Sequence, residues 1–297
     1  IPKARSGATV TIMVEAMQAG KAVGIVNSAA VTEPGTGAFL AQVASRKDQE
    51  AIAAQILAAR PDVIFGGGEQ FFLPDGERGY HGVGVRKDGR NLIDEARRAG
   101  YQVVRTREEL AALPKGESRV LGLFAADNTF NEGTEESLAS AGQPVFQTQA
   151  PRFDTMIDAA IAILSDDPDG FLLVGNEEAT DNMAGHNNAA AVLEAGAGTD
   201  RAIATVLRHA AHNPSLTLVV ASDSDCGGMI AGPRWGSDRP VAPYGANGAP
   251  VDGAHGRPFM AAPDQRGRRL PFVVHWASGD DMAGGLVARG IGPGAAL

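Results

Sequence analysis

Short apolar runs alternate along most of the chain with segments of helical periodicity. The apolar runs occupy residues 22–26, 63–65, 101–104, 120–124, 171–174, 216–221 and 271–276. Runs without polar alternation are typical of strands that are buried on both faces of a parallel sheet. Helical patterns occupy residues 9–19, 39–59, 92–99, 107–112, 154–164 and 188–212, and a short last helix is expected near 282–288. This repetition predicts an α/β fold, a three-layer sandwich whose mostly parallel central sheet carries helices on both faces.

Two stretches lack this periodicity. Residues 74–90 are rich in proline, glycine and charge and are expected to form a surface excursion. Residues 228–270 have dense glycine and proline, and loops of that length in a compact domain are usually functional or disordered. Because no repeat, low-complexity segment or linker interrupts the pattern, we expect one domain over residues 1–297.

Composition narrows the classes of function. The chain is 44% hydrophobic, which supports a substantial core, and its net charge of −9 argues against nucleic acid or an anionic membrane as a partner. A small anionic substrate needs only local positive charge and stays possible. The single cysteine, Cys226, excludes an internal disulfide. No apolar run has the length of a membrane span, and residues 1–6 lack the apolar segment of a signal peptide.

The central stretch, residues 171–188, places potential ligands after a strand. Glu177, Asp181 and His186 follow the apolar run within a dozen or so residues. Open α/β sheets bind ligands beyond the carboxyl ends of their strands, and carboxylates and imidazoles are groups that divalent metals accept. The alternative is a solvated acidic loop in which Asp181 caps the next helix.

Two further groups carry similar chemistry. Asp223 and Asp225 follow the apolar run at 216–221, and Asp252 and His255 lie in the long loop. Each group alone is a weak indication of a metal site, because such an aspartate is more often a helix cap and such a histidine is more often a hydrogen-bonding surface residue. Together they offer carboxylates and imidazoles on separated segments, as a two-metal hydrolase requires.

Several segments resemble the alkaline phosphatases, and they occur in that family's order over nearly the whole chain. They are Ala22-Val-Gly-Ile-Val-Asn-Ser28, Pro34-Gly-Thr-Gly-Ala-Phe-Leu-Ala-Gln-Val-Ala-Ser-Arg46, Asp62-Val-Ile-Phe-Gly-Gly-Gly-Glu-Gln-Phe71, Leu121-Gly-Leu-Phe124 and Leu218-Val-Val-Ala-Ser-Asp223. Phosphopentomutases and sulfatases share the broader architecture, but the triple-glycine and Leu-Gly-Leu-Phe segments favour alkaline phosphatases. The resemblance implies hydrolysis of small phosphate monoesters through a phosphoserine intermediate, with two or three bound Zn²⁺ and Mg²⁺ ions, in a periplasmic or secreted homodimer.

Residue roles follow from the same resemblance. It implies that Asp181 and His255 bind the first zinc ion and that Asp223 binds the second. It also implies that Arg46 holds two oxygens of the substrate phosphate, a task that suits a planar, bidentate guanidinium. The alternative for Arg46 is a solvated arginine at the end of a helix.

The central motif departs from the family pattern in its spacing. The family's histidine follows its aspartate by four residues, whereas His186 follows Asp181 by five. On a helix, four residues keep two side chains on one face and five turn the second side chain about 140° away. A bulge at Gly185 would absorb the extra residue, or Asn187 would take the role.

Other departures exchange imidazole or hydroxyl for carboxylate or amide. The magnesium-binding glutamate falls on Asn176, with Glu177 beside it, and the threonine that helps hold magnesium falls on Gly35. The histidine after the second-zinc aspartate is Ser224, and Asp225 is able to supply an oxygen instead. Such a ligand set suits harder cations, Mg²⁺ or Ca²⁺. Cys226 is a potential zinc ligand, but the role of a small buried residue is favoured.

The family's serine nucleophile belongs upstream of Ile1. Ser6 and Ser28 lie downstream of that point and lack the adjacent aspartate. We therefore expect the C-terminal part of a phosphatase fold, with its first strand and catalytic serine elsewhere and with apolar edges that are exposed or covered by another segment or subunit. The competing hypothesis is a non-catalytic relative that binds an anion, a metal or a partner. A mutase or sulfatase relative is a third option, and it also requires an upstream nucleophile.

Overall fold

The computed structural model describes residues 7, 9–233, 241–254, 258–284 and 286–295. Its residues gather into two compact units, which are described separately. Unit 1 consists of Ile1–Asn131, Phe146–Glu178 and Ala197–Arg208, and unit 2 of Glu132–Val145, Ala179–Gly196 and His209–Leu297. The prediction of a single domain stays a prediction. Within the described residues, no helix has both the length and the hydropathy needed to cross a membrane.

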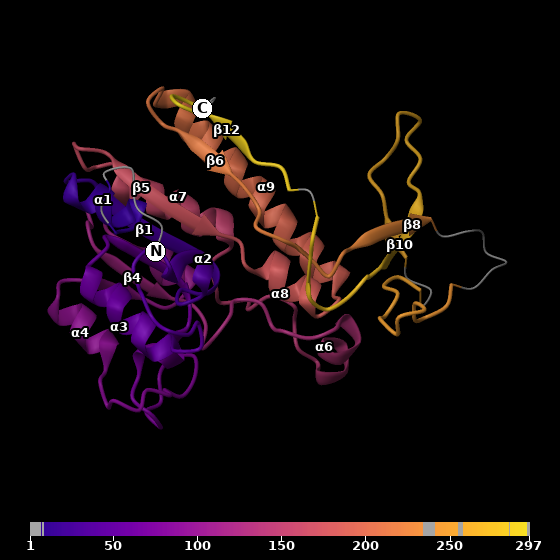
Figure 1. The fold of residues 1–297 in the computed structure, drawn as a ribbon, viewed down its shortest axis with the longest axis horizontal. Coiled ribbons are helices and arrows are strands. Elements are labelled where there is room, and N and C mark those ends of the chain that lie inside the picture. Colours follow the sequence, from indigo (N-terminus) through magenta and orange to yellow (C-terminus); the bar gives the residue numbers. More distant parts are fainter. Residues whose placement is uncertain (1–6, 8, 234–240, 255–257, 285, 296–297) are drawn as a thin grey trace. The chain divides into compact units, whose positions relative to one another are not determined.

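Unit 1 is built on a parallel sheet of five strands in the order β3-β4-β2-β1-β5 (Figure 1). The strands are β1 (Ala22–Ala30), β2 (Val63–Gly67), β3 (Gln102–Val104), β4 (Val120–Leu123) and β5 (Phe171–Asn176). All nine residues of β1 are buried, because β1 has a strand on each side and helices over both faces. Strand β5 is an edge strand, and its apolar residues are only half-buried, so the prediction that they form a fully buried strand was wrong.

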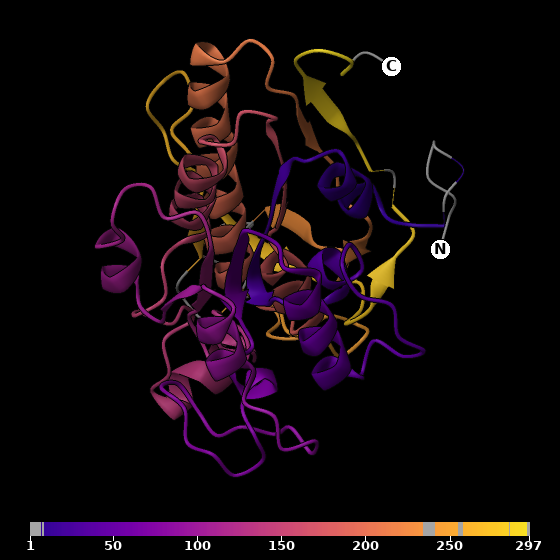
Figure 2. The same ribbon diagram turned by 90° about the vertical axis from the view of Figure 1, so that its left-hand side faces the viewer.

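Helices cover both faces of this sheet, which confirms the predicted α/β class. The helices of unit 1 are α1 (Ile12–Gln18), α2 (Pro34–Gly37), α3 (Gln49–Ala59), the 3-10 helix η1 (Glu69–Phe72), α4 (Leu92–Arg98), α5 (Arg107–Ala111) and α7 (Phe153–Leu164). Helices α1, α3 and α4 share one apolar cluster with Ile25 of β1. Helix α7 packs on Val26 and Phe65 in a second cluster. Figure 1 shows α7 beside the sheet, and Figure 2 shows the same ribbon turned by 90°. Because Ile25 and Val26 are consecutive in a strand, they face opposite sides of the sheet.

The long helix predicted over 39–59 begins only at Gln49. The side-chain oxygen of Gln55 accepts from the Gln42 backbone N–H at 2.8 Å, and the Gln55 amide donates to the Gln42 carbonyl at 3.1 Å. These bonds satisfy the backbone of Gln42 without helical partners. The partly buried Phe39 and the buried Leu40 contribute to the core from this non-helical segment.

Unit 2 contains short helices and small antiparallel sheets. Its elements are α6 (Glu135–Ala141), α8 (Ala179–Gly185), β6 (Leu218–Val220), β7 (Asp225–Cys226), β8 (Ile230–Pro233), β9 (Phe259–Met260), β10 (Pro271–His275), β11 (Asp281–Met282) and β12 (Arg289–Ile291). Helix α9 (Ala189–His212) supplies residues to both units.

Two predicted strands do not join the parallel sheet. Strand β6 pairs with β12 in an antiparallel ribbon, and Val219 is 66% exposed because the ribbon has only two strands. Strand β10 lies between β8 and β9 in an antiparallel sheet. The helix predicted near 282–288 is also wrong, because its first residue belongs to β11 and the other described residues there are not helical.

A buried carboxylate organises the core of unit 2. Asp252 is 2% exposed, and its Oδ2 accepts from the Ala189 backbone N–H at 2.8 Å and from the Trp276 indole N–H at 3.0 Å. Its backbone exchanges two hydrogen bonds with Val274. The carboxylate thus ties the first residue of α9 to the segment around β10, where negative charge also complements the helix dipole. Burial raises the pKa of Asp252 to about 6.

The triple-glycine segment permits close approach of neighbouring backbone. A Cβ atom on Gly67 would lie 1.8 Å from the carbonyl oxygen of Asp127, and one on Gly66 would lie 2.7 Å from Val31. Gly68 has φ of +97°, a conformation that favours glycine. These residues let β2 pass against the chain that follows β4.

We predict that Gly67→Ala destabilises the chain by roughly 2–3 kcal/mol, because backbone must shift to admit the methyl group. The matched control is Gly196→Ala in α9, where a Cβ would meet nothing within 4 Å. That change is expected to stabilise the helix by about 0.5–1 kcal/mol. Urea unfolding of both variants measures the two effects, and equal effects of the same sign would contradict the steric explanation.

A second prediction concerns pH. The folded-state pKa of Asp252 is raised, so its contribution to stability is fully present below the unfolded value near 3.8 and is lost as pH rises through about 6. Asp252→Asn keeps an acceptor oxygen and removes the charge. Between pH 3.5 and 7, the free energy of unfolding of the variant should therefore rise by about 3 kcal/mol relative to that of the parent.

Urea unfolding at several pH values measures this difference. Asp264→Asn is the control, because hydrogen bonds from Arg268 lower the pKa of Asp264 and give its contribution the opposite dependence on pH. A difference between parent and Asp252→Asn that does not change with pH would refute the assignment.

Candidate functional site

Three side chains from three segments of unit 2 meet in one cluster. Asp181 comes from α8, Cys226 from β7 and Asp281 from β11. Each offers a potential ligand atom, and these atoms all lie within 4.8 Å of one another. Among the described residues this is a set of donors that suits a divalent cation.

Local structure explains why the three meet. Strands β7 and β11 are antiparallel, and Cys226 stands directly opposite Asp281. Asp181 lies in the first turn of α8, so the alternative that it caps the helix is wrong. The Ser224 hydroxyl donates to Asp281 Oδ1 at 2.9 Å and holds that carboxylate in place.

The cluster concentrates negative charge. Burial raises the pKa of Asp181, and the nearby carboxylates of Asp281 and Asp223 add to the rise. Burial, and then the carboxylates of Asp181 and Asp281, raise the pKa of the Cys226 thiol to about 12. The Oδ1 atom of Asp181 is buried without a hydrogen-bond partner among the described residues. A buried, unpaired carboxylate oxygen beside two further donors fits a cation ligand.

The structure places the other predicted metal ligands differently. Asp223 is exposed but close enough to Asp181 to affect its pKa. Asp225 is exposed and neighbours Cys226 in β7, so the two side chains point to opposite faces. His186 follows the end of α8, and its Nε2 lies 3.4 Å from Glu132 Oε2 rather than in the cluster.

Two further predicted ligands cannot be placed in the cluster. His255 lies outside the described residues. Glu177 follows β5 and belongs to unit 1. The alternative ligand Asn187 uses its side-chain amide to donate to the carbonyls of Ala184 and Ser278 at 3.0 and 2.7 Å. The assignments of these residues stay predictions.

A second locus lies beyond the carboxyl ends of β1 and β5 in unit 1. A Cβ atom on Gly35 would lie 2.3 Å from the amide nitrogen of Asn176, so these two positions, which both depart from the family pattern, are adjacent. The Asn176 amide donates to Glu178. The absence of a side chain at Gly35 therefore makes room for the asparagine amide.

Arg46 lies near this locus along the chain, before α3 begins. Its guanidinium forms an ion pair with Glu33 at 2.8 Å, while 65% of its side chain is exposed. Gln49 donates to the second oxygen of Glu33 at 3.3 Å and to the Arg46 carbonyl at 3.1 Å. Arg46 is thus oriented by neighbours but accessible to an anion. It is not at the end of a helix.

Asp281 is a potential ligand that was not predicted from the sequence. The signal was present, because Asp280 and Asp281 follow the apolar run at 271–276 as Asp223 and Asp225 follow the run at 216–221. A helix was expected to begin near residue 282, so the pairing of Asp281 with Cys226 across two strands was not foreseen. Cys226 was considered, and the structure places its thiol among the carboxylates.

Comparisons with known proteins agree with this fold. The alkaline phosphatase family model matches residues 3–261. The repressible alkaline phosphatase of Saccharomyces cerevisiae is 29% identical over 74% of this chain and 40% of its own length. Streptomycin-6-phosphate phosphatase of Streptomyces griseus is 30% identical over 72% of this chain and 54% of its own length. The chain thus spans about half the length of these relatives.

Solved structures give the same fold. Alkaline phosphatase from the Antarctic bacterium TAB5 superposes with a TM-score of 0.68 at 18% identity, covering 96% of this chain and 69% of that one. The Thermus thermophilus enzyme gives 0.68 at 23% identity, covering 94% and 67%. A variant of the TAB5 enzyme has magnesium bound in a site named M3. With the family model matching most of its residues, the chain belongs to the alkaline phosphatase family.

Proposed function

We propose that the chain is part of a metal-dependent phosphomonoester hydrolase. The observation that supports this most is the cluster of Asp181, Cys226 and Asp281, whose ligand atoms lie within 4.8 Å of one another. Membership of a phosphatase family supplies the reaction class. A divalent cation bound there would offset the negative charge of the transferred phosphoryl group.

Different residues of this chain would bind the cation and the substrate phosphate. Asp181, Cys226 and Asp281 would bind the cation, with Asp223 close by. His186, His255, Glu177 and Asp225 stay as further ligands proposed from the family resemblance. Arg46 would exchange its ion pair with Glu33 for two oxygens of the phosphate, since a guanidinium binds carboxylate and phosphate with the same planar geometry.

The activity would belong to a longer protein. The chain spans about half the length of the relatives that it matches, and by resemblance a serine upstream of Ile1 would accept the phosphoryl group. Zinc and magnesium, a homodimer and an exported location are likewise proposed from the resemblance. The cluster itself combines hard carboxylates with one soft thiol, so it suits Zn²⁺ or Mn²⁺ better than Ca²⁺.

A non-catalytic relative that binds a metal or an anion is the alternative. The adjacent departures at Gly35 and Asn176 favour it, because an amide hydrogen-bonded to Glu178 stands where the family pattern has a magnesium-binding carboxylate. The two proposals differ in turnover by the longer protein and share cation binding by this chain.

The metal proposal is tested by calorimetric titration of the chain with Zn²⁺, Mn²⁺ and Mg²⁺. Asp181→Asn and Asp281→Asn should each weaken binding of the preferred ion at least about ten-fold, since each removes a charged ligand. Asp280→Asn is the matched control, because it removes the same charge one residue from the cluster. Undiminished binding to Asp281→Asn, together with loss of binding to His255→Ala, would favour the ligand set implied by the family instead.

The arginine proposal is tested in the longer parent with p-nitrophenyl phosphate. Arg46→Ala should lower kcat/KM by roughly 30–100-fold, corresponding to about 2–3 kcal/mol for charged hydrogen bonds. Arg46→Lys should restore little, because an ammonium cannot make the bidentate contact. The control is Arg97→Ala, which removes a surface arginine paired with Asp94. A parent that turns over substrate normally with Arg46→Ala refutes the role.

A further inference from the structure

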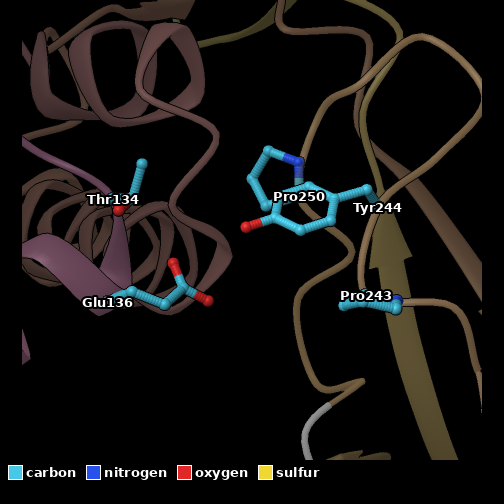
Figure 3. Close-up of a pocket in the computed structure, with 5 residues that line it drawn as sticks. All are labelled: Thr134, Glu136, Pro243, Tyr244 and Pro250. Atoms are coloured by element: carbon cyan, nitrogen blue, oxygen red, sulfur yellow. The ribbon is translucent and has the colours of Figure 1, made fainter.

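A small pocket in unit 2 lies outside the residues assigned to the metal cluster. Its volume is about 180 Å³, and it is lined by Thr134, Glu136, Pro243, Tyr244 and Pro250. Figure 3 shows the hydroxyl end of Tyr244 and the carboxylate of Glu136 pointing toward one another across the gap. The two side chains come from different segments, the first turn of α6 and a loop before β9.

The loop that carries Tyr244 is held by its own hydrogen bonds. Tyr244 and Pro250 form an antiparallel bridge, and the backbone N–H of Val251 donates to the Pro243 carbonyl at 2.9 Å. The Asn247 amide donates to the carbonyls of Trp276 and Ala277 at 2.8 and 3.0 Å. This wall of the pocket is therefore fixed to the core of unit 2 without any ligand.

The opposite wall is fixed as well. Thr134 caps α6 by accepting from the Ser137 backbone N–H, and Glu135 accepts from the Ala190 backbone N–H at 2.8 Å. Glu135 is thereby engaged, whereas Glu136 makes no hydrogen bond or ion pair to another described residue. Burial raises the pKa of both Glu135 and Asp252, and the negative charge of Glu136 raises each pKa further.

We propose that this pocket binds the cationic nitrogen group of a small organic molecule, an alkylammonium or a guanidinium. Glu136 supplies the countercharge and acceptor oxygens, the Tyr244 hydroxyl supplies a further acceptor, and its aromatic ring attracts a cation through its quadrupole. The two prolines line part of the remaining surface. This site does not depend on the proposed phosphatase activity.

Size and charge decide between possible occupants. A volume of about 180 Å³ exceeds the ~30 Å³ share of one liquid water but is below the ~300–1,000 Å³ of sites that enclose drug-sized ligands. The pocket therefore admits a group of several atoms rather than a whole cofactor. Glu136 and Tyr244 are both exposed, so an occupant reaches them from solvent. The charge of Glu136 disfavours an anion and attracts a cation.

The test uses the full chain labelled with 3-fluorotyrosine. The sequence has three tyrosines, so three ¹⁹F signals are expected, and loss of one signal in Tyr244→Phe assigns the reporter. Tyr80 and the buried Tyr101 serve as internal references. Methylguanidinium and methylammonium should shift the Tyr244 signal saturably at millimolar concentration, whereas methylurea, which has the shape of methylguanidinium but no charge, should not.

Variants complete the experiment. Glu136→Gln should weaken binding of both cations at least three-fold, and a urea-unfolding curve that matches the parent's would show that the fold is intact. Glu117→Gln removes one negative charge from unit 1 and should leave the affinity unchanged. The proposal is overturned if neither cation gives a saturable shift, if methylurea acts as methylguanidinium does, or if Glu136→Gln binds as tightly as the parent.

Discussion

The packing of like charges at Asp181 and Asp281 is the constraint on which unit 2 depends. The ligand atoms of the two carboxylates lie within 4.8 Å of one another, and two unit charges at that separation repel by roughly 3–4 kcal/mol at an effective dielectric constant near 20. The pairing of β7 with β11 and the position of α8 nevertheless hold them together. A shared proton, the hydrogen bond between Cys226 and Asp181, or a cation would relieve this repulsion. The proposed cation is supported by Asp181 Oδ1, which is buried without a hydrogen-bond partner among the described residues. Strand pairing and the position of α8 thus hold these side chains together despite their like charge.

Other buried or half-buried carboxylates in the chain accept hydrogen bonds from protein groups, which offset the cost of their burial. Asp252 Oδ2 accepts from a backbone N–H and an indole N–H, although Asp252 Oδ1, like Asp181 Oδ1, is buried without a partner among the described residues. Glu135 accepts from the N–H of Ala190. In unit 1, Glu33 is satisfied by Arg46 and Gln49. Each of these carboxylates has neutral or cationic donors from the protein, which fix local structure. The contrast supports a functional role for the cluster at Asp181, where the main neighbours are other acids and a thiol.

The sequence predicted the parallel sheet well because its strands are apolar runs separated by helical patterns, as at β1, β2 and β4. It predicted the pairing of later strands badly. An apolar run such as 216–221 shows that a strand forms but not whether it joins a parallel sheet, and β6 pairs with β12 through contacts between residues over 60 positions apart. The start of α3 was missed because the side-chain bonds of Gln55 to Gln42 have no periodic signature.

The candidate site illustrates the same limit. The five-residue spacing left open whether His186 joins Asp181, and in the structure His186 Nε2 lies 3.4 Å from Glu132 Oε2. The spacing of residues within one helix does not reveal which side chains from other segments lie beside Asp181. Cys226 and Asp281 lie there because β7 pairs with β11. The cation ligands therefore exist as a set only when β7 and β11 are paired and α8 is formed. If the proposed cation binds this set better than it binds the unfolded chain, metal binding and the folding of unit 2 would be thermodynamically linked.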